Sequence, residues 1–526
     1  MADTSETESK EMGEAEARRL FEREIGVAGI GTKRSSAGNS PFLKFIVGRQ
    51  APIYQHALRE TQKGLSQSNP FRGGLGLAVE KVERFPSSVE ATVLLTLLAR
   101  STRAVAQDSV ERGFSVPYVP FRNQEDHQLA QPASHVVVGR RGVGKSTLLL
   151  RAIELLKQSA AIVAVVDVQA FSSLTGDELY REILQDVLIS LIEDVGRVAR
   201  LRNFEIDTSG LSQIAADLAA KQLSPAAAIP RIRRELRVIT TATKSSAYLF
   251  LDDFHLISWD LQPKLLHLLH GAFKGADGWI KVAGIRTLLN YYSPESREGL
   301  EVPGDAQIVS LDLTLENPEA AESHLRVILE GFLRAVGYSS TTAVLPDNAF
   351  RRLAWATAGV PRDFLQMFAR AVEHARRNKH AAVTLSDVNV AIGEFGQRKM
   401  DDLGQDARNA EGELRHLLSV LEEYCLDEKG TNGFLLFSEE SRERRLIHIL
   451  NDLRLVHLVN PSITPDRAGE KYEAYILDYS RFTGFRRRQN ILEVMPEDGQ
   501  FKAAELRRLP KVTSEFLAKR SKETIR

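Results

Sequence analysis

The residues from Gly139 to Ser146 read G-R-R-G-V-G-K-S, which is the spacing of a phosphate-binding loop. Glycines let the backbone curl so that several N–H groups point at one anion. Lys145 would reach the β- and γ-phosphates of a nucleotide, and the Ser146 hydroxyl would ligate Mg²⁺. We therefore predict ATP and Mg²⁺ as cofactors. The predicted nucleotide contacts are Gly139, Arg140, Arg141, Gly142, Val143, Gly144, Lys145, Ser146 and Thr147.

An acid pair, Asp252 and Asp253, ends the apolar run Tyr248–Leu251. A buried strand would deliver Asp252 beside the glycine loop, where its carboxylate can hold Mg²⁺ through water. Asp253 could orient or deprotonate an attacking water, although aspartate is shorter than glutamate and reaches less far. The alternative is a pair of acids that ends an ordinary strand. The upstream glycine loop favours the functional interpretation.

Both motifs need strands that end beside helices, and the flanking sequence supplies them. Apolar runs rich in β-branched residues predict strands at 136–138, 162–168, 248–251, 279–285 and 307–311. Helical patterns alternate with these strands, which predicts an α/β P-loop NTPase core with a parallel sheet over residues 114–316. The long interval between Lys145 and Asp252 must hold additional helices, including 215–221 and 226–238.

Two helical regions follow the core. Residues 317–405 form a predicted all-helical lid, with helices at 318–336, 346–358, 362–378 and 385–395. Residues 406–497 have the helix-then-hairpin order of a winged-helix domain, with helices at 411–424 and 439–452 and strands at 455–459 and 472–477. The tail, 498–526, is basic and polar.

The N-terminal region, residues 1–113, is the least informative. It is expected to be partly disordered or helical, with disorder at the very tip of its charged start, and glycine-rich turns separate its short apolar pieces. The sequence assigns these pieces no fold. A helix is predicted over 87–107, capped by Ser87 or Ser88.

Composition limits the partners. Lys plus Arg and Asp plus Glu both total 69, so the formal net charge is zero and any nucleic-acid site must be a local patch. The one cysteine, Cys425, excludes an intrachain disulfide and a cysteine-based zinc site. No apolar run approaches the ~20 residues that span a bilayer, and the first residues lack a secretory pattern. We therefore expect a cytoplasmic protein without a membrane partner.

In their order, these motifs resemble those of AAA+ P-loop ATPases, and most closely those of the Orc1/Cdc6-like branch. Arg286 and Thr287 follow the 279–285 strand, where that family has its sensor-1 polar residue. Gly359-Val360-Pro361-Arg362 is similar to the sensor-2 motif, whose arginine reaches the γ-phosphate. A winged helix then follows the lid, as in the initiators. The resemblance covers residues 114–490 and implies an ATPase.

Two of these positions have alternative interpretations. Pro361 suits the first turn of a helix, which leaves Arg362 at a helix N-terminus, where a cation needs an anionic partner. That partner is either the nucleotide or the neighbouring Asp363. An arginine at position 286, with the Asp-Asp pair, also resembles STAND signalling ATPases, which turn over slowly. The resemblance therefore implies an ATPase that is slow or stimulated by a partner.

Arg297 lies between the sensor-1 strand and the last predicted strand, the interval in which the family has an arginine finger. Such a finger completes the site of a neighbouring subunit, so we expect an oligomer or a partner protein. The alternative is a surface arginine beside Glu295 and Glu298. His135 and His255 flank strands and are predicted to be structural, because phosphoryl transfer needs no histidine base.

The predicted winged helix carries basic clusters that could contact DNA phosphates. Acidic residues interleave in its second helix, which weakens that helix as a reader of bases. The predicted function is an ATP-driven switch that couples nucleotide state to DNA binding or oligomer assembly. The alternative is a STAND-like signalling scaffold, for example in defence or mobile elements, whose winged helix contacts protein. The candidate DNA contacts are Arg442, Arg444, Arg445, Arg467, Arg486, Arg487 and Arg488.

Overall fold

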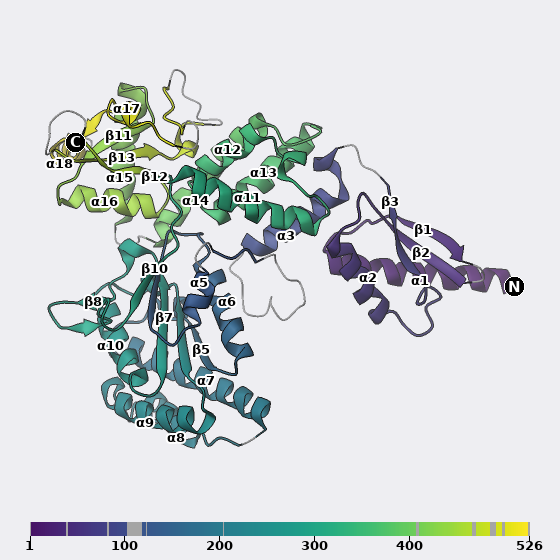
Figure 1. The fold of residues 1–526 in the computed structure, drawn as a ribbon, viewed down its shortest axis with the longest axis horizontal. Helices are drawn as coiled ribbons and strands as arrows, with labels where there is room; N and C mark the ends of the chain where they lie inside the picture. The colour runs from purple at the N-terminus through teal and green to yellow at the C-terminus, as the bar shows by residue number, and fades with distance from the viewer. Residues whose placement is uncertain are drawn as a thin grey trace.

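The computed structural model describes residues 2–37, 40–80, 84–102, 118–121, 124–203, 205–406, 410–464, 470–483, 491–496 and 500–523. Figure 1 shows a helical lid between an N-terminal unit and a C-terminal unit, with the α/β core on one side of the lid. Among the described residues, no helix is both long enough and apolar enough to cross a membrane.

The core is a parallel sheet in the order β10-β4-β7-β6-β5. Because parallel strands end at one edge, this sheet brings the residues after each strand together. All of the predicted core strands are present. Their bounds are β4 (His135–Val138), β5 (Ile162–Asp167), β6 (Ala247–Asp252), β7 (Gly278–Gly284) and β10 (Gln307–Ser310).

Helices cover both faces of this sheet, because alternate strand residues point to opposite sides. Val136 and Val138 pack with the helices of one face, whereas Val137 packs with α6 on the other. The additional helices expected between Lys145 and Asp252 are α7, α8 and α9. The core helices are α5 (Glu125–Leu129), α6 (Lys145–Gln158), α7 (Gly176–Arg202), α8 (Ser209–Ala219), α9 (Pro225–Thr243) and α10 (Gln262–Phe273). A short hairpin, β8 (Tyr292–Ser293) and β9 (Glu298–Gly299), precedes β10.

The lid is all-helical, as predicted, and contains one helix from the N-terminal region. That helix, α3 (Val89–Thr102), packs against α13. Ser88 caps it, since its Oγ accepts a hydrogen bond from the Ala91 N–H at 3.1 Å. The other lid helices are α11 (Pro318–Ala335), α12 (Asp347–Ala356), α13 (Pro361–Arg377) and α14 (Leu385–Asp406), the last extending well beyond its predicted end.

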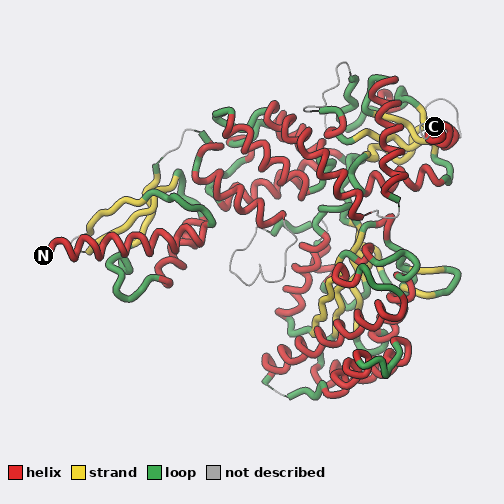
Figure 2. Tube along the Cα trace, turned by 180° about the vertical axis from the view of Figure 1, so that it is seen from behind, coloured by secondary structure: helices red, strands yellow, loops and turns green. Residues whose placement is uncertain are grey.

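The N-terminal unit, to which the sequence assigned no fold, is a three-stranded sheet with two helices (Figure 2). Buried Glu90 of α3 accepts hydrogen bonds from the backbone N–H groups of Gly48 at 2.7 Å and Arg49 at 3.1 Å, which fixes this unit to the lid. Its elements are α1 (Ala2–Ile25), β1 (Thr32–Ala37), β2 (Ser40–Val47), α2 (Pro52–Gly64) and β3 (Leu75–Val79).

The C-terminal unit is a winged-helix domain with a sheet in the order β12-β13-β11-β14. Two of its strands, β11 and β14, were not predicted, and β14 comes from the tail. The helices are α15 (Glu411–Glu422), followed by a π-helical stretch to Glu428, α16 (Arg442–Asp452), α17 (Ala503–Leu506) and α18 (Ser514–Glu523). The strands are β11 (Gly433–Phe437), β12 (Val456–Ile463), β13 (Tyr472–Leu477) and β14 (Lys511–Val512).

Candidate nucleotide site

The glycine loop connects β4 to α6 at the carboxyl edge of the sheet. Gly142 and Gly144 have φ values of 83° and 104°, which only glycine adopts without strain. A Cβ atom on Gly142 would lie 2.9 Å from the Cβ of Arg362, and the Arg362 N–H donates to the Gly142 carbonyl at 3.2 Å. The start of lid helix α13 therefore rests directly on the loop, and the lack of a side chain at Gly142 allows that contact.

Lys145 is buried at the first position of α6. Its Nζ donates to the carbonyl oxygens of Gly139 at 2.9 Å and Arg140 at 3.1 Å. Burial lowers the pKa of Lys145, and the charges of Asp253 and Asp252 oppose that shift. A phosphate would be a stronger acceptor for this ammonium than the two carbonyls.

The acid pair reaches the same edge at the end of β6. Asp252 accepts a hydrogen bond from the Ser146 side chain, and burial and the neighbouring Asp253 raise its pKa. Asp253 has a left-handed backbone with φ 49°, and its side chain is 44% exposed, so water can reach it. The described residues contain no cluster of three or more metal-ligand side chains. Mg²⁺ in nucleotide sites needs only one or two protein oxygens besides the phosphates, and Ser146 with Asp252 supplies that set.

The fully buried Arg140 side chain turns away from the loop's anion-binding face. Its Nη2 donates to the carbonyl oxygens of Leu313 and Ala358, both at 2.8 Å, and its Nε lies 3.3 Å from Asp312 Oδ1. The Arg140 N–H also donates to Asp312 at 2.9 Å. This side chain thus clamps the loop to the chain after β10 and to the lid, a role that the motif did not reveal.

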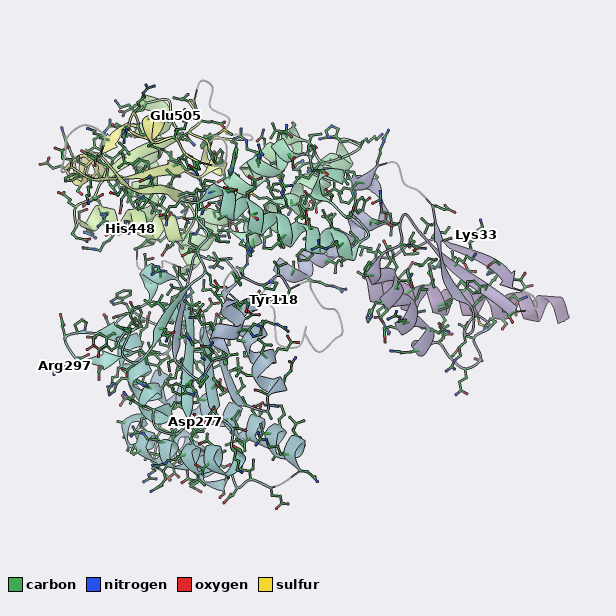
Figure 3. The ribbon with its side chains drawn as sticks, in the orientation of Figure 1. Lys33, Tyr118, Asp277, Arg297, His448 and Glu505 are labelled. Carbon is green, nitrogen blue, oxygen red and sulfur yellow. The ribbon has the colours of Figure 1, made fainter. Side chains whose placement is uncertain are left out.

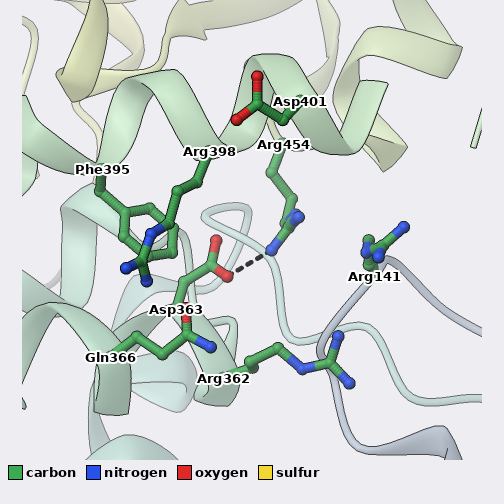
Figure 4. Close-up of a pocket in the computed structure, with 8 residues that line it drawn as sticks. All are labelled: Arg141, Arg362, Asp363, Gln366, Phe395, Arg398, Asp401 and Arg454. Atoms are coloured by element: carbon green, nitrogen blue, oxygen red, sulfur yellow. Dashed lines mark hydrogen bonds and ion pairs between the residues drawn. The ribbon is translucent and has the colours of Figure 1, made fainter. Parts of the chain in front are cut away.

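Arg362 faces a cavity of about 350 Å³ beside the loop (Figure 4). Burial lowers the pKa of Arg362, and the positive charges of Arg141 and Arg454 add to the shift. Asp363 does not form the direct ion pair with Arg362 that was one alternative, because its carboxylate pairs with Arg454 of the winged-helix domain. Both Asp363 and Arg454 are 1% exposed. This geometry leaves Arg362 able to receive an anion.

Residues 129–291 match the family described as AAA domain. The match contains the glycine loop, the acid pair and strands β4 to β7 of the sheet. The α/β core is an AAA domain. No curated protein matches this sequence.

Solved structures of the initiator branch resemble the chain at low identity. The Aeropyrum pernix ORC2 protein with ADPNP and ADP is 14% identical, covers 80% of this chain and 99% of its own, and has a TM-score of 0.38. Drosophila ORC bound to DNA is 15% identical, with coverages of 76% and 92% and a TM-score of 0.35. Cdc6p from Pyrobaculum aerophilum is 15% identical, with coverages of 80% and 99% and a TM-score of 0.33.

The two other predicted catalytic arginines lie on the surface of the AAA domain. Arg286 follows β7 and its Nη2 donates to Ser310 Oγ at 3.0 Å. Arg297 lies in the β8–β9 turn with φ 57°, at the outer edge of the AAA domain and far from the lid (Figure 3). Arg297 is exposed in this turn.

The histidines differ in their distance from the AAA site. His135 is at the amino end of β4, where its Nδ1 lies 2.9 Å from Lys281 Nζ. Burial, and then Lys281, lowers the pKa of His135 to about 3. That pair is structural. His255 lies closer to the predicted site, with its Nδ1 4.0 Å from Asp253 Oδ1.

The candidate DNA-binding arginines of α16 are mostly engaged with acids. Arg442 pairs with Glu413 of α15, and Arg444 pairs with Glu440 and with Glu473 of β13. Arg445 is exposed and forms no ion pair among the described residues. The other candidates lie outside the described residues: Arg467, Arg486, Arg487 and Arg488.

The sequence missed the docking turn, residues 452–455, which joins α16 to β12. Buried Asp452 accepts two hydrogen bonds from Thr287, the residue after Arg286, from its N–H at 3.1 Å and its Oγ1 at 2.8 Å. Two residues later, Arg454 pairs with Asp363, the residue after Arg362. The one sequence signal for this role is that Asp452 and Arg454 interrupt an otherwise apolar stretch. The winged-helix domain thus contacts the AAA domain beside the predicted sensor-1 position and the lid beside the predicted sensor-2 position.

A buried charge cluster fixes the same turn to lid helix α14. Lys399 donates to Asp478 at the end of β13 and to the Arg454 carbonyl oxygen. His457 Nε2 lies 2.8 Å from Asp478 Oδ2, and burial lowers the pKa of His457 to about 4. These contacts connect the lid and the winged-helix domain through groups that water does not reach.

Proposed function

We propose that the chain binds ATP with Mg²⁺ in its AAA domain and hydrolyses it to ADP and phosphate. The nucleotide state then controls the position of the winged-helix domain. The observation that carries this proposal is the docking turn, because Asp452 contacts Thr287 and Arg454 contacts Asp363. A change at either sensor position on nucleotide binding would alter one of these contacts.

The residues have distinct roles in this proposal. Loop N–H groups and Lys145 hold the phosphates, and Ser146 and Asp252 hold Mg²⁺, which neutralises phosphate charge when bound. Asp253 orients the attacking water. Arg362 contacts the terminal phosphate from the lid. Arg286 lies after β7, at the carboxyl edge of the sheet, as the sensor-1 residue. Arg297 acts as an arginine finger in the site of a neighbouring subunit.

We propose that the switch controls DNA binding by the winged-helix domain, through Arg445 and the basic residues of the wing. Specific contacts favour a second candidate, a protein-docking winged helix. Arg442 and Arg444 are neutralised by acids, and the end of α16 is buried against the AAA domain. The two candidates differ in the salt dependence of DNA binding, because each phosphate contact released contributes about 0.9 to the slope.

Three measurements test the proposal. Asp252→Ala should remove the Mg²⁺ dependence of ATP binding. Asp253→Asn should keep ATP binding and stop hydrolysis, whereas hydrolysis at the wild-type rate would remove Asp253 from the mechanism. Arg297→Ala protein mixed with Lys145→Ala protein should regain partial hydrolysis if subunits share a site. A monomer in ATP, with no recovery on mixing, would exclude the shared site.

A further inference from the structure

The strand β3 is one edge of the N-terminal sheet, whose order is β1-β2-β3, and no strand pairs with that edge in the part of the chain that the structure describes. The N–H of Leu43 in β2 donates to the Gly74 carbonyl at 2.8 Å, which fixes the phase of the parallel pairing. Only alternate residues of a strand bond to a given neighbour. The peptide groups that point away from β2, to the open edge, are therefore those of Leu75, Leu77 and Val79.

The two edges of this sheet differ in composition. The edge strand β1 is polar and contains Lys33 and Arg34, and charged side chains on an edge discourage pairing with another strand. The strand β3 reads Leu-Gly-Leu-Ala-Val, without a charge or a proline. Its last residue, Val79, is apolar and yet 51% exposed. An open, uncharged and apolar edge is the kind to which a further strand adds.

Charges at the two ends of β3 make this edge complementary to itself. Arg72 precedes the strand and Glu80 follows it, and both are exposed. Neither forms an ion pair among the described residues, since a strand of about 17 Å separates them within one chain. Antiparallel pairing of two copies brings Arg72 of one copy beside Glu80 of the other at both ends. Parallel pairing would instead place like charges together, so the charges favour the antiparallel arrangement.

We propose that two copies of the chain dimerise through β3, antiparallel about a two-fold axis at Leu77. Leu75 of one copy lies opposite Val79 of the other, so every outward peptide group of the strand finds a partner. The two N-terminal sheets become one continuous sheet. This interface lies at the end of the lid away from the winged-helix domain, and it needs neither nucleotide nor Arg297 (Figure 1). Because Glu90 fixes each N-terminal unit to its lid, the dimer joins two lids.

The first test reverses the end charges in the full chain and measures dimerisation by sedimentation without nucleotide. Arg72→Glu and Glu80→Arg each place like charges at both ends of the paired strands, and each should weaken the dimer about 10-fold. An equimolar mixture of the two variants has opposite charges at both ends again. The mixture should therefore form heterodimers with the wild-type affinity. A role of these residues within one chain would not be rescued by mixing.

The second test removes a hydrogen-bond donor from the open edge. Val79→Pro deletes an N–H that β2 does not use, and the dimer loses this bond twice, so dimerisation should weaken about 10- to 100-fold. Ser36→Pro, at an outward position of β1, is the matched control and should dimerise normally. Melting temperatures check that both variants fold. A wild-type chain that stays monomeric at every concentration overturns the proposal, as does a dimer that Val79→Pro and the charge reversals leave unchanged. Neither result depends on ATP or DNA binding.

Discussion

The arginines of α16 and those of the cavity beside the loop have opposite electrostatic surroundings. On α16, Arg444 pairs with Glu440 and Glu473, and Arg442 pairs with Glu413. Burial opposes the ionisation of Glu473, yet hydrogen bonds from His448 and Arg444 lower its pKa to about 2. Around the cavity, Arg362 and Arg398 form no ion pair with an acid in the part of the chain that the structure describes. Acids thus neutralise Arg442 and Arg444 of the basic helix, whereas the described acids leave Arg362 and Arg398 of the lid without an ion pair.

This difference shows why arginine clusters in a sequence do not identify anion sites by themselves. The acids that neutralise α16 come partly from α15 and β13, distant in the chain. The cavity arginines come from the glycine loop, the lid and the docking turn, and only Asp363 and Asp401 line the cavity beside them as acids. Whether an arginine can bind an anion therefore depends on which acids the fold brings beside it.

The largest effect is expected from the buried pair between Asp363 and Arg454. Asp363→Ala leaves Arg454 buried without this carboxylate and should lower the free energy of unfolding by about 3–5 kcal/mol. Glu413→Ala, which breaks the exposed pair with Arg442, should cost less than about 1 kcal/mol. Urea denaturation measures both. Equal costs would contradict the distinction between the two regions.

Lys145→Ala should weaken ATP binding at least about 100-fold, because the variant loses the charged donors that reach the phosphates. Lys157→Ala, on the same helix but away from the loop, is the control and should bind ATP normally. Fluorescent ATP titration measures both affinities. Unchanged ATP affinity in the Lys145 variant would exclude the loop as the nucleotide site.

Acidification should weaken Mg²⁺-dependent ATP binding at a higher pH than an ordinary aspartate would cause. Mg²⁺ binds the ionised form of Asp252, and burial with Asp253 raises the pKa of Asp252, so protonation begins earlier as pH falls. Asp253→Asn removes one cause and should move the loss to lower pH. Titrations of ATP affinity against pH test this shift, and coincident curves would contradict it.

The smallest effect concerns the unpaired arginine of α16. Arg445→Gln should reduce the salt slope of DNA binding by about 0.9 without loss of stability. Arg444→Gln should instead destabilise the winged-helix domain and leave that slope unchanged. Binding curves at several salt concentrations measure the slopes. A larger slope change for Arg444→Gln would mean that its acid pairs open on DNA.

The sequence predicted what is local in the chain. The glycine loop, Asp252 and Pro361-Arg362 are short motifs whose backbone conformation depends on adjacent residues. The AAA strands were found because each is a continuous apolar run. Strands β11 and β14 and the N-terminal sheet were missed, because they are short or separated by glycine-rich turns and depend on distant partners.

Contacts between units could not be predicted, because they also join residues that are distant in the chain. Arg454 and Asp363 are 91 positions apart, Thr287 and Asp452 are 165 apart, and Arg140 and the Ala358 carbonyl of the lid are 218 apart. No single sequence shows which polar groups meet over such intervals. These pairs nevertheless decide how the AAA domain, the lid and the winged helix fit together.

Hydrogen exchange of the docking turn tests the central claim most directly. Amides of residues 452–458 and of Thr287 should change their protection when ATP and Mg²⁺ bind the wild type, because nucleotide acts on both sensor positions. The same amides should not respond in Lys145→Ala protein. Unchanged protection of the turn, in wild-type protein shown to be saturated with ATP, would contradict nucleotide control of the winged-helix domain.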